Sequence, residues 1–344
     1  MESNAPTARI GPNYTLRVAR ALTACAAAIA ALDARVSVSS MASPWKMRAA
    51  WSGYARALQL QSIELDEIAV FSWGCDLKLP ARPIPNTTVD PFDAFAPWLE
   101  RLGPERQAEW RDDLPTAVAE AAEAREHPTI IRALELARHY ARIDRTMSPW
   151  LALPRILCGT GVTVTPLPCL TGGVKAFRLM RTPADDDWLA ALNHLSSSAT
   201  TAMARLDEME QIHRRGLRAI ASEYRPSALP RLLALSHHRP LLSPQGVADA
   251  LDLSVAGASK LLDRAVDAEL LVEVTGRRSW RVFLPPDLAV LFGLAAPRRG
   301  RPRNEPPALP ADRTIAAAVE TFDKQMAEVE ALLARINQRR SPAN

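Results

Sequence analysis

Arginines gather in one short stretch of the sequence, between residues 271 and 303. Seven arginines fall there against only Glu273 and Asp287, a net charge of +5 in a chain whose total is +4. The seven are Arg277, Arg278, Arg281, Arg298, Arg299, Arg301 and Arg303. A guanidinium group can bind a phosphate through two parallel hydrogen bonds. Clustered arginines of this kind are typical of nucleic-acid contacts, so the stretch predicts a phosphate-binding surface.

A smaller set of polar residues lies just before these arginines. The set is Ser254, Ser259, Lys260 and Arg264. The apolar residues among them, Ala258, Leu261, Leu262 and Val266, repeat at helical spacing, and Ser254 can cap the helix they predict. If this helix is the second of a helix-turn-helix, its first residues meet base edges in the DNA major groove. We therefore expect Ser254, Ser259 and Lys260 to face the groove, with Arg264 as a further contact.

Residues 241–283 predict the elements that would position these side chains. Ser243 and Pro244 are typical of a helix start, and apolar residues at helical spacing follow them. Asp252 occupies the turn position, which requires positive φ and is often glycine; aspartate tolerates that conformation better than most residues. The segment therefore predicts two short helices joined by a tight turn.

A β-hairpin is predicted directly after the second helix. Residues 271–275 alternate as in a strand, 276–279 form a turn, and 280–283 return. Such a hairpin is the wing of a winged helix, and Arg277, Arg278 and Arg281 would hold the DNA backbone or minor groove. The alternative is a winged helix that serves only protein contacts.

Residues 297–303 resemble an AT-hook, a basic segment with a Gly-Arg-Pro core. Proline fixes φ, glycine allows a close backbone approach, and arginine is attracted to the narrow minor groove of A·T-rich DNA. Arg298, Arg299, Arg301 and Arg303 would extend the DNA contact there. A solvated basic tether is the alternative.

Helical periodicity dominates elsewhere and predicts a mainly α fold. We expect a helical domain over 1–182, a long connecting helix over 183–226 and the winged helix-turn-helix over 227–293. A basic linker over 294–311 and a terminal helix over 312–340 would follow.

The terminal segment alternates apolar spacings of four and three. Its apolar positions are Ile315, Val319, Phe322, Met326, Val329, Leu333 and Ile336. Three heptads are near the minimum for a coiled coil. The helix either pairs with a second copy or folds back on the long helix, and we favour a homodimer because helix-turn-helix proteins usually read two half-sites.

Catalytic and cofactor motifs are not recognisable in the sequence. Residues 159–161 and 172–173 lack the pattern of a phosphate-binding loop, and no histidine has metal-ligand spacing. Asp185–Asp187 could bind a metal, but a helix start explains them better. The four cysteines show no CxxC spacing and indicate buried thiols in a reducing compartment. We expect no enzyme activity, no cofactor and no metal.

An apolar run over 21–32 is too short for a bilayer, which requires roughly 20 residues. We expect it to be a buried helix of a cytoplasmic protein that does not contact a membrane.

Two blocks of the sequence carry a resemblance to known families. Residues 241–283 resemble the winged helix at the C-terminus of many Fic-family proteins, but the AMP-transfer motif of those proteins is absent. Residues 167–176, LPCLTGGVKA, resemble a block in plasmid-encoded alphaproteobacterial helix-turn-helix proteins. That resemblance extends over about 45–290 and implies DNA binding, with a helical domain of unknown function and no catalytic residues.

The sequence therefore predicts a double-stranded DNA-binding protein, sequence-specific or AT-preferring, that regulates transcription, and the resemblance implies a plasmid-related role. Two alternatives stay open. One is a degenerate Fic-like protein without transferase activity, and the other is a protein-interaction module such as a toxin–antitoxin component.

Overall fold

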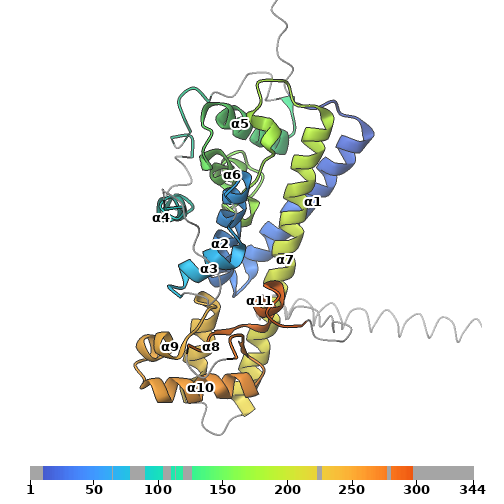
Figure 1. Cartoon of the computed structure of the whole chain (residues 1–344). Coiled ribbons are helices and arrows are strands. Elements are labelled where there is room, and N and C mark those ends of the chain that lie inside the picture. The colour runs from blue at the N-terminus through green and yellow to red at the C-terminus, as the bar shows by residue number, and fades with distance from the viewer. Residues whose placement is uncertain are drawn as a thin grey trace, which may run out of the picture. The chain divides into compact units, whose positions relative to one another are not determined.

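A computed structural model describes residues 11–63, 65–77, 90–103, 110–112, 114–118, 126–222, 227–276 and 280–296. Contacts divide the chain into two units, Met1–Gly300 and Arg301–Asn344, and the second lies outside the described residues. The described part is mainly helical, with one two-stranded sheet (Figure 1). The prediction of a mainly α fold is confirmed.

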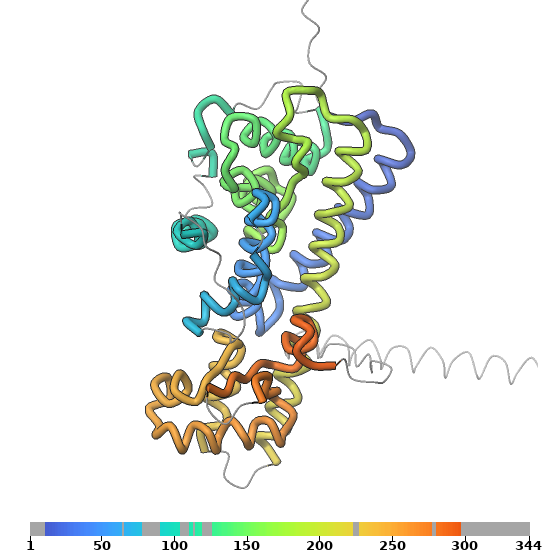
Figure 2. The backbone as a smooth tube through the Cα atoms, in the orientation of Figure 1, coloured from blue at the N-terminus to red at the C-terminus, as the bar shows by residue number. Residues whose placement is uncertain are grey.

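Two long helices lie side by side and run in the same direction (Figures 1 and 2). They are α1 (Leu16–Val38) and α7 (Asp185–Ser222), and α7 has 38 residues. At 1.5 Å per residue α7 is about 57 Å long. The buried residues of α1 are spaced as one helical stripe: Val18, Cys25, Ile29, Leu32 and Val36. This stripe packs on α7, and the Arg35–Glu210 ion pair joins the two helices near the end of α1.

The expectation that the apolar segment around residues 21–32 is too short to cross a bilayer was wrong. Helix α1 extends well beyond residues 21–32, and its 23 residues are long and apolar enough to cross a bilayer. Length and composition alone are weak grounds, because a core helix passes the same test. A core helix of this kind is mostly buried, whereas 28% of the apolar window of α1 is buried, including the stripe that packs on α7.

Seven shorter described helices lie between α1 and α7 in the sequence. They are α2 (Ala42–Leu60), α3 (Glu67–Gly74), α4 (Phe95–Arg101), α5 (Thr129–Ile143), α6 (Ser148–Gly159), and the 3-10 helices η3 (Pro168–Leu170) and η4 (Lys175–Arg178). Tyr54 of α2 packs against Phe95 and Trp98 of α4, with ring centroids 5.2 and 5.9 Å away. The core of this part is therefore rich in large aromatic side chains.

The Leu-Pro-Cys-Leu block is held tightly against α2. The Thr171 hydroxyl donates to the carbonyl of Gly53 at 2.8 Å. A Cβ at Gly53 would lie 2.1 Å from the carbonyl oxygen of Pro168. Only glycine allows this approach of η3 to the helix.

Three helices and the small sheet follow α7 and share a second hydrophobic cluster. The elements are α8 (Leu229–His238), α9 (Pro244–Leu251), α10 (Val255–Asp267), β1 (Val272–Glu273) and β2 (Phe283–Leu284). Strands β1 and β2 are antiparallel, and Val272 pairs with Leu284. This is the order of a winged helix-turn-helix. Helix α11 (Pro286–Leu291) comes next, and its Leu288 belongs to the main cluster.

Both strands are shorter than the sequence predicted. Only two residues of each strand pair, and Leu242 forms an isolated bridge to Phe283 instead. Helices α8 and α11 were not predicted. The predicted internal division of residues 1–293 stays a prediction, and the terminal heptad helix lies outside the described residues.

Candidate nucleic-acid interface

Local capping fixes the two helices of the helix-turn-helix. The Ser243 hydroxyl accepts from the amide of Gly246, and that of Ser254 accepts from the amide of Gly257, each at 3.1 Å. Asp252 between them has φ of 54° and lies in the left-handed region. All three features were predicted from the sequence, and together they fix the start of α9, the turn and the start of α10.

Helix α10 buries one face and leaves its first turn open. Ala258, Leu261 and Leu262 face the cluster, with 0, 5 and 0% of their surfaces exposed. Ser254, Val255, Ala256 and Lys260 are exposed, and Ser259 is half-buried. The start of α10 is therefore accessible to a partner, which is the part of a recognition helix that meets base edges. It carries one positive charge, from Lys260, and few hydrogen-bonding groups, since the Ser254 hydroxyl already serves as a cap.

Arg281 is held inside the hairpin by two carboxylates. Its guanidinium donates to Glu273 at 2.7 Å and to Asp263 of α10 at 2.6 Å. It also lies over the ring of Phe283 at 4.8 Å. The hydrogen bonds to Glu273 and then to Asp263 raise the pKa of Arg281. The residue thus joins the hairpin to α10, and a phosphate contact from it would require one of these ion pairs to open.

Arg264 is half-buried on α10 and also has an interaction within the fold. The remaining arginines of the predicted surface lie outside the described residues. They are Arg277, Arg278, Arg298, Arg299, Arg301 and Arg303. The same is true of the heptad residues expected to form the dimer. The phosphate-binding roles of these arginines stay predictions.

The winged helix-turn-helix itself is electrically balanced. Residues 229–296 contain seven basic and seven acidic side chains, histidines excluded. The basic ones are Arg231, Arg239, Lys260, Arg264, Arg277, Arg278 and Arg281, and the acidic ones are Asp249, Asp252, Asp263, Asp267, Glu269, Glu273 and Asp287. The local excess of positive charge therefore comes mainly from residues 297–303.

Trp280 is an exposed aromatic residue that the sequence analysis did not single out. Its side chain is 83% exposed, the largest value among the exposed large hydrophobic residues described. Its φ of 64° is unusual for a bulky side chain. Trp280 directly follows Arg277, Arg278 and Ser279 in the sequence, and these three lie outside the described residues. An aromatic residue next to arginines in a short basic turn was the available signal for it.

The other candidate groups have structural roles. Asp185 accepts from Asn13, and Asp187 pairs with Arg181 at 2.8 Å, at the first turn of α7. Within the described residues no group of three or more metal-ligating side chains could hold an ion. The cysteines form no disulfide, and Cys25, Cys75 and Cys169 are buried. Burial raises the pKa of Cys169 to about 12, so this thiol is unreactive at neutral pH.

Comparisons with models of known families and with curated proteins found no match.

Proposed function

We propose that this chain binds double-stranded DNA and regulates transcription. The exposed start of α10 would enter the major groove, with Ser259 and Lys260 nearest the bases. Arg277 and Arg278 at the hairpin turn would contact the phosphate backbone or minor groove. Arg298, Arg299, Arg301 and Arg303 would extend the contact along the duplex.

The accessible first turn of α10 is the observation that supports this proposal best. Val255, Ala256 and Lys260 are exposed, while the opposite face of the same helix packs into the second cluster. A helix-turn-helix kept only as a structural support would be expected to bury this turn under a neighbour. Trp280, exposed on the hairpin, offers a further contact to sugars or bases.

Residues 229–296 carry no net charge, histidines excluded, and this affects how much of the DNA affinity would come from base contacts and how much from phosphate contacts. Few polar groups are available at the start of α10, so direct base readout would be modest. Most of the affinity would come from phosphate contacts by the basic segment over 297–303 and by Arg277 and Arg278. An AT-preferring protein with moderate sequence specificity fits this balance. We further propose a homodimer through the heptad residues, which would read two half-sites.

Binding of the Arg277→Ala/Arg278→Ala double variant to a labelled duplex tests this proposal. We expect affinity to fall by a similar factor for every sequence, since phosphate contacts carry no sequence information. Arg17→Ala is the matched control, because Arg17 lies on α1 with its side chain 79% exposed. Unchanged affinity of the double variant in low salt would refute the role of these two arginines.

A protein-interaction module is the second candidate, because an exposed tryptophan also suits a protein contact. Trp280→Ala separates the two. Loss of a co-purifying protein from nuclease-treated lysate, with duplex affinity absent in both forms, would favour this candidate.

A further inference from the structure

A cavity of about 100 Å³ lies between α2, α3, α7 and α11, away from the proposed DNA contacts. Its apolar side is formed by Trp45, Ala49, Phe71, Met209 and Leu288. Its polar side holds three arginines and two carboxylates: Arg48, Arg56, Arg205, Glu67 and Asp287. The cavity therefore combines an apolar wall with five charged side chains.

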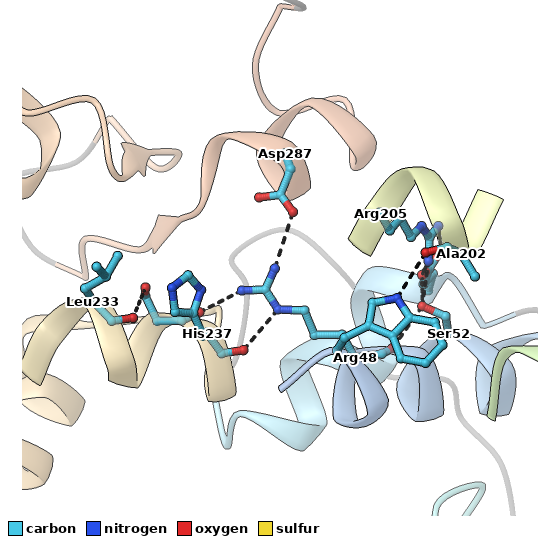
Figure 3. A network of polar contacts seen from close by, with 10 residues as sticks. Arg48, Ser52, Ala202, Arg205, Leu233, His237 and Asp287 are labelled. Atoms are coloured by element: carbon cyan, nitrogen blue, oxygen red, sulfur yellow. Dashed lines mark hydrogen bonds and ion pairs between the residues drawn. The ribbon is translucent and has the colours of Figure 1, made fainter. Parts of the chain in front are cut away.

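Two of the three arginines in the cavity have carboxylate partners (Figure 3 shows Arg48 and Arg205). Arg205 donates to the two carboxylate oxygens of Glu67 at 2.6 and 3.1 Å. Arg48 reaches Asp287 of α11 at 3.3 Å. Within each pair the positive and negative charges balance. The third arginine, Arg56, has no such partner among the described residues.

Arg56 has only neutral partners. One guanidinium nitrogen donates to the Ser198 hydroxyl and lies 3.3 Å from Nε2 of His194. Burial and then Arg56 itself lower the pKa of His194 to about 4, so this imidazole is neutral at physiological pH. Among the described residues no carboxylate lies within ion-pair distance of Arg56, and the nearby Glu67 is already paired with Arg205. Among the described residues, Arg56 is thus the one arginine of the cavity lining without a carboxylate at ion-pair distance, and we call its charge uncompensated in this sense.

Two buried polar atoms of the lining residues also have no hydrogen-bond partner. They are Nε of Arg205, a donor, and Oδ1 of Asp287, an acceptor. Unsatisfied buried polar atoms are costly, and a bound molecule is one of the explanations for them in native proteins. An anionic oxygen would satisfy the Arg205 donor.

We propose that this cavity binds a small monocarboxylate with an apolar tail. The carboxylate would pair with Arg56 and accept from Nε of Arg205, and the tail would lie against Trp45, Phe71 and Leu288. A divalent anion fits less well, because only one arginine of the lining lacks a carboxylate partner. The proposal does not depend on DNA binding. It adds that the ligand would contact α2, α7 and α11 together, and α11 directly follows β2 of the hairpin.

Binding of sodium butyrate by the full chain, compared with butyramide, tests the proposal. The amide has nearly the same shape but no charge. We expect butyrate to raise the thermal midpoint of unfolding and butyramide to leave it unchanged, because only the anion compensates Arg56. Equal responses to the two compounds, or no response to butyrate, would overturn the proposal.

Two variants locate the site. Arg56→Gln removes the uncompensated charge, and we expect butyrate affinity to fall about tenfold or more, the usual loss for a charge-assisted hydrogen bond. Thr201→Phe fills the cavity from an exposed position of α7 and should abolish binding even if Arg56→Gln fails to fold. Arg17→Gln is the control and should bind as the parent does. Parental affinity in Thr201→Phe would overturn the proposal. These measurements contain no DNA, so their outcome is separate from that of the duplex-binding test.

Discussion

At the scale of single residues, His237 is a buried histidine whose pKa is strongly lowered by the fold. It is 3% exposed, and its Nε2 lies 3.2 Å from Nδ1 of His213. Burial is the main cause that lowers its pKa from 6.5 to about 3, and Arg48, His213 and His238 add to the shift. His237 is therefore neutral in the folded protein at physiological pH.

This lowered pKa predicts an acid-sensitive free energy of unfolding. Between pH 6.5 and about 3 the unfolded chain binds a proton at this position that the folded chain refuses. Stability is therefore complete above pH 6.5 and falls as the pH is lowered, with a slope that approaches about 1.4 kcal/mol per pH unit. His237→Gln should reduce this slope in urea unfolding, whereas exposed His238→Gln should keep it. Identical slopes in all three proteins would contradict the account.

Residues also set a limit on what charge patterns predict. The arginine-rich sequence predicted that Arg281 is available to bind a phosphate, whereas the structure pairs it with Glu273 and Asp263. Its partners Glu273 and Asp263 are 8 and 18 positions away in the sequence, and only the hairpin brings both of them to it. The caps at Ser243 and Ser254 were predicted correctly because their partners lie three residues away.

At the scale of elements, Arg48 joins α2 to α8 and α11. It is 5% exposed and donates to the carbonyl oxygens of Ser236 and His237 at 2.8 and 3.1 Å. Those carbonyls belong to the last turn of α8, where the helix dipole favours a cation. Figure 3 shows the same guanidinium directed at Asp287. One buried side chain on α2 thus bonds both to the end of α8 and to α11.

Replacing this arginine should be strongly destabilising. Arg48→Met leaves Asp287 buried without its cation, and breaking a buried pair in this way costs about 3–5 kcal/mol. The double variant Arg48→Met/Asp287→Leu should recover part of that loss, because no uncompensated charge remains. Urea unfolding measures both, with Arg17→Met on α1 as a control for an exposed site. A loss in Arg48→Met no larger than in the control would show that the joint does not hold the elements together.

The joint at Arg48 could not be predicted from the sequence, because Asp287 is 239 residues away. Helix α11 was missed for a different reason. It has six residues and begins at the second proline of a pair, which is too short for helical periodicity to be recognised. Helix α7 (Asp185–Ser222) was predicted nearly to its ends, over 183–226, because its apolar stripe is long. The cavity beside Arg56 combines residues from α2, α3, η3, α7 and α11, so no local pattern indicated it.

At the scale of the whole molecule, the two proposed activities, DNA binding and binding of a small carboxylate, involve different parts of the chain. The exposed start of α10, the hairpin and residues 297–303 would bind DNA, while the cavity near Arg56 would bind a small anion. Helix α11 follows the hairpin in sequence and lines the cavity through Asp287 and Leu288. If both proposals hold, a carboxylate that changes DNA affinity must itself be bound with a correspondingly changed affinity in the DNA complex.

Titration of a labelled duplex with the full chain at increasing salt is the most direct test of the central claim. If Arg277, Arg278 and the arginines of 297–303 contact phosphates, the logarithm of affinity should fall linearly with the logarithm of salt concentration. Six such contacts predict a loss of about 1,000-fold between about 50 and 200 mM salt. A duplex that stays unbound at the lowest salt, or an affinity that does not change with salt, would contradict the claim.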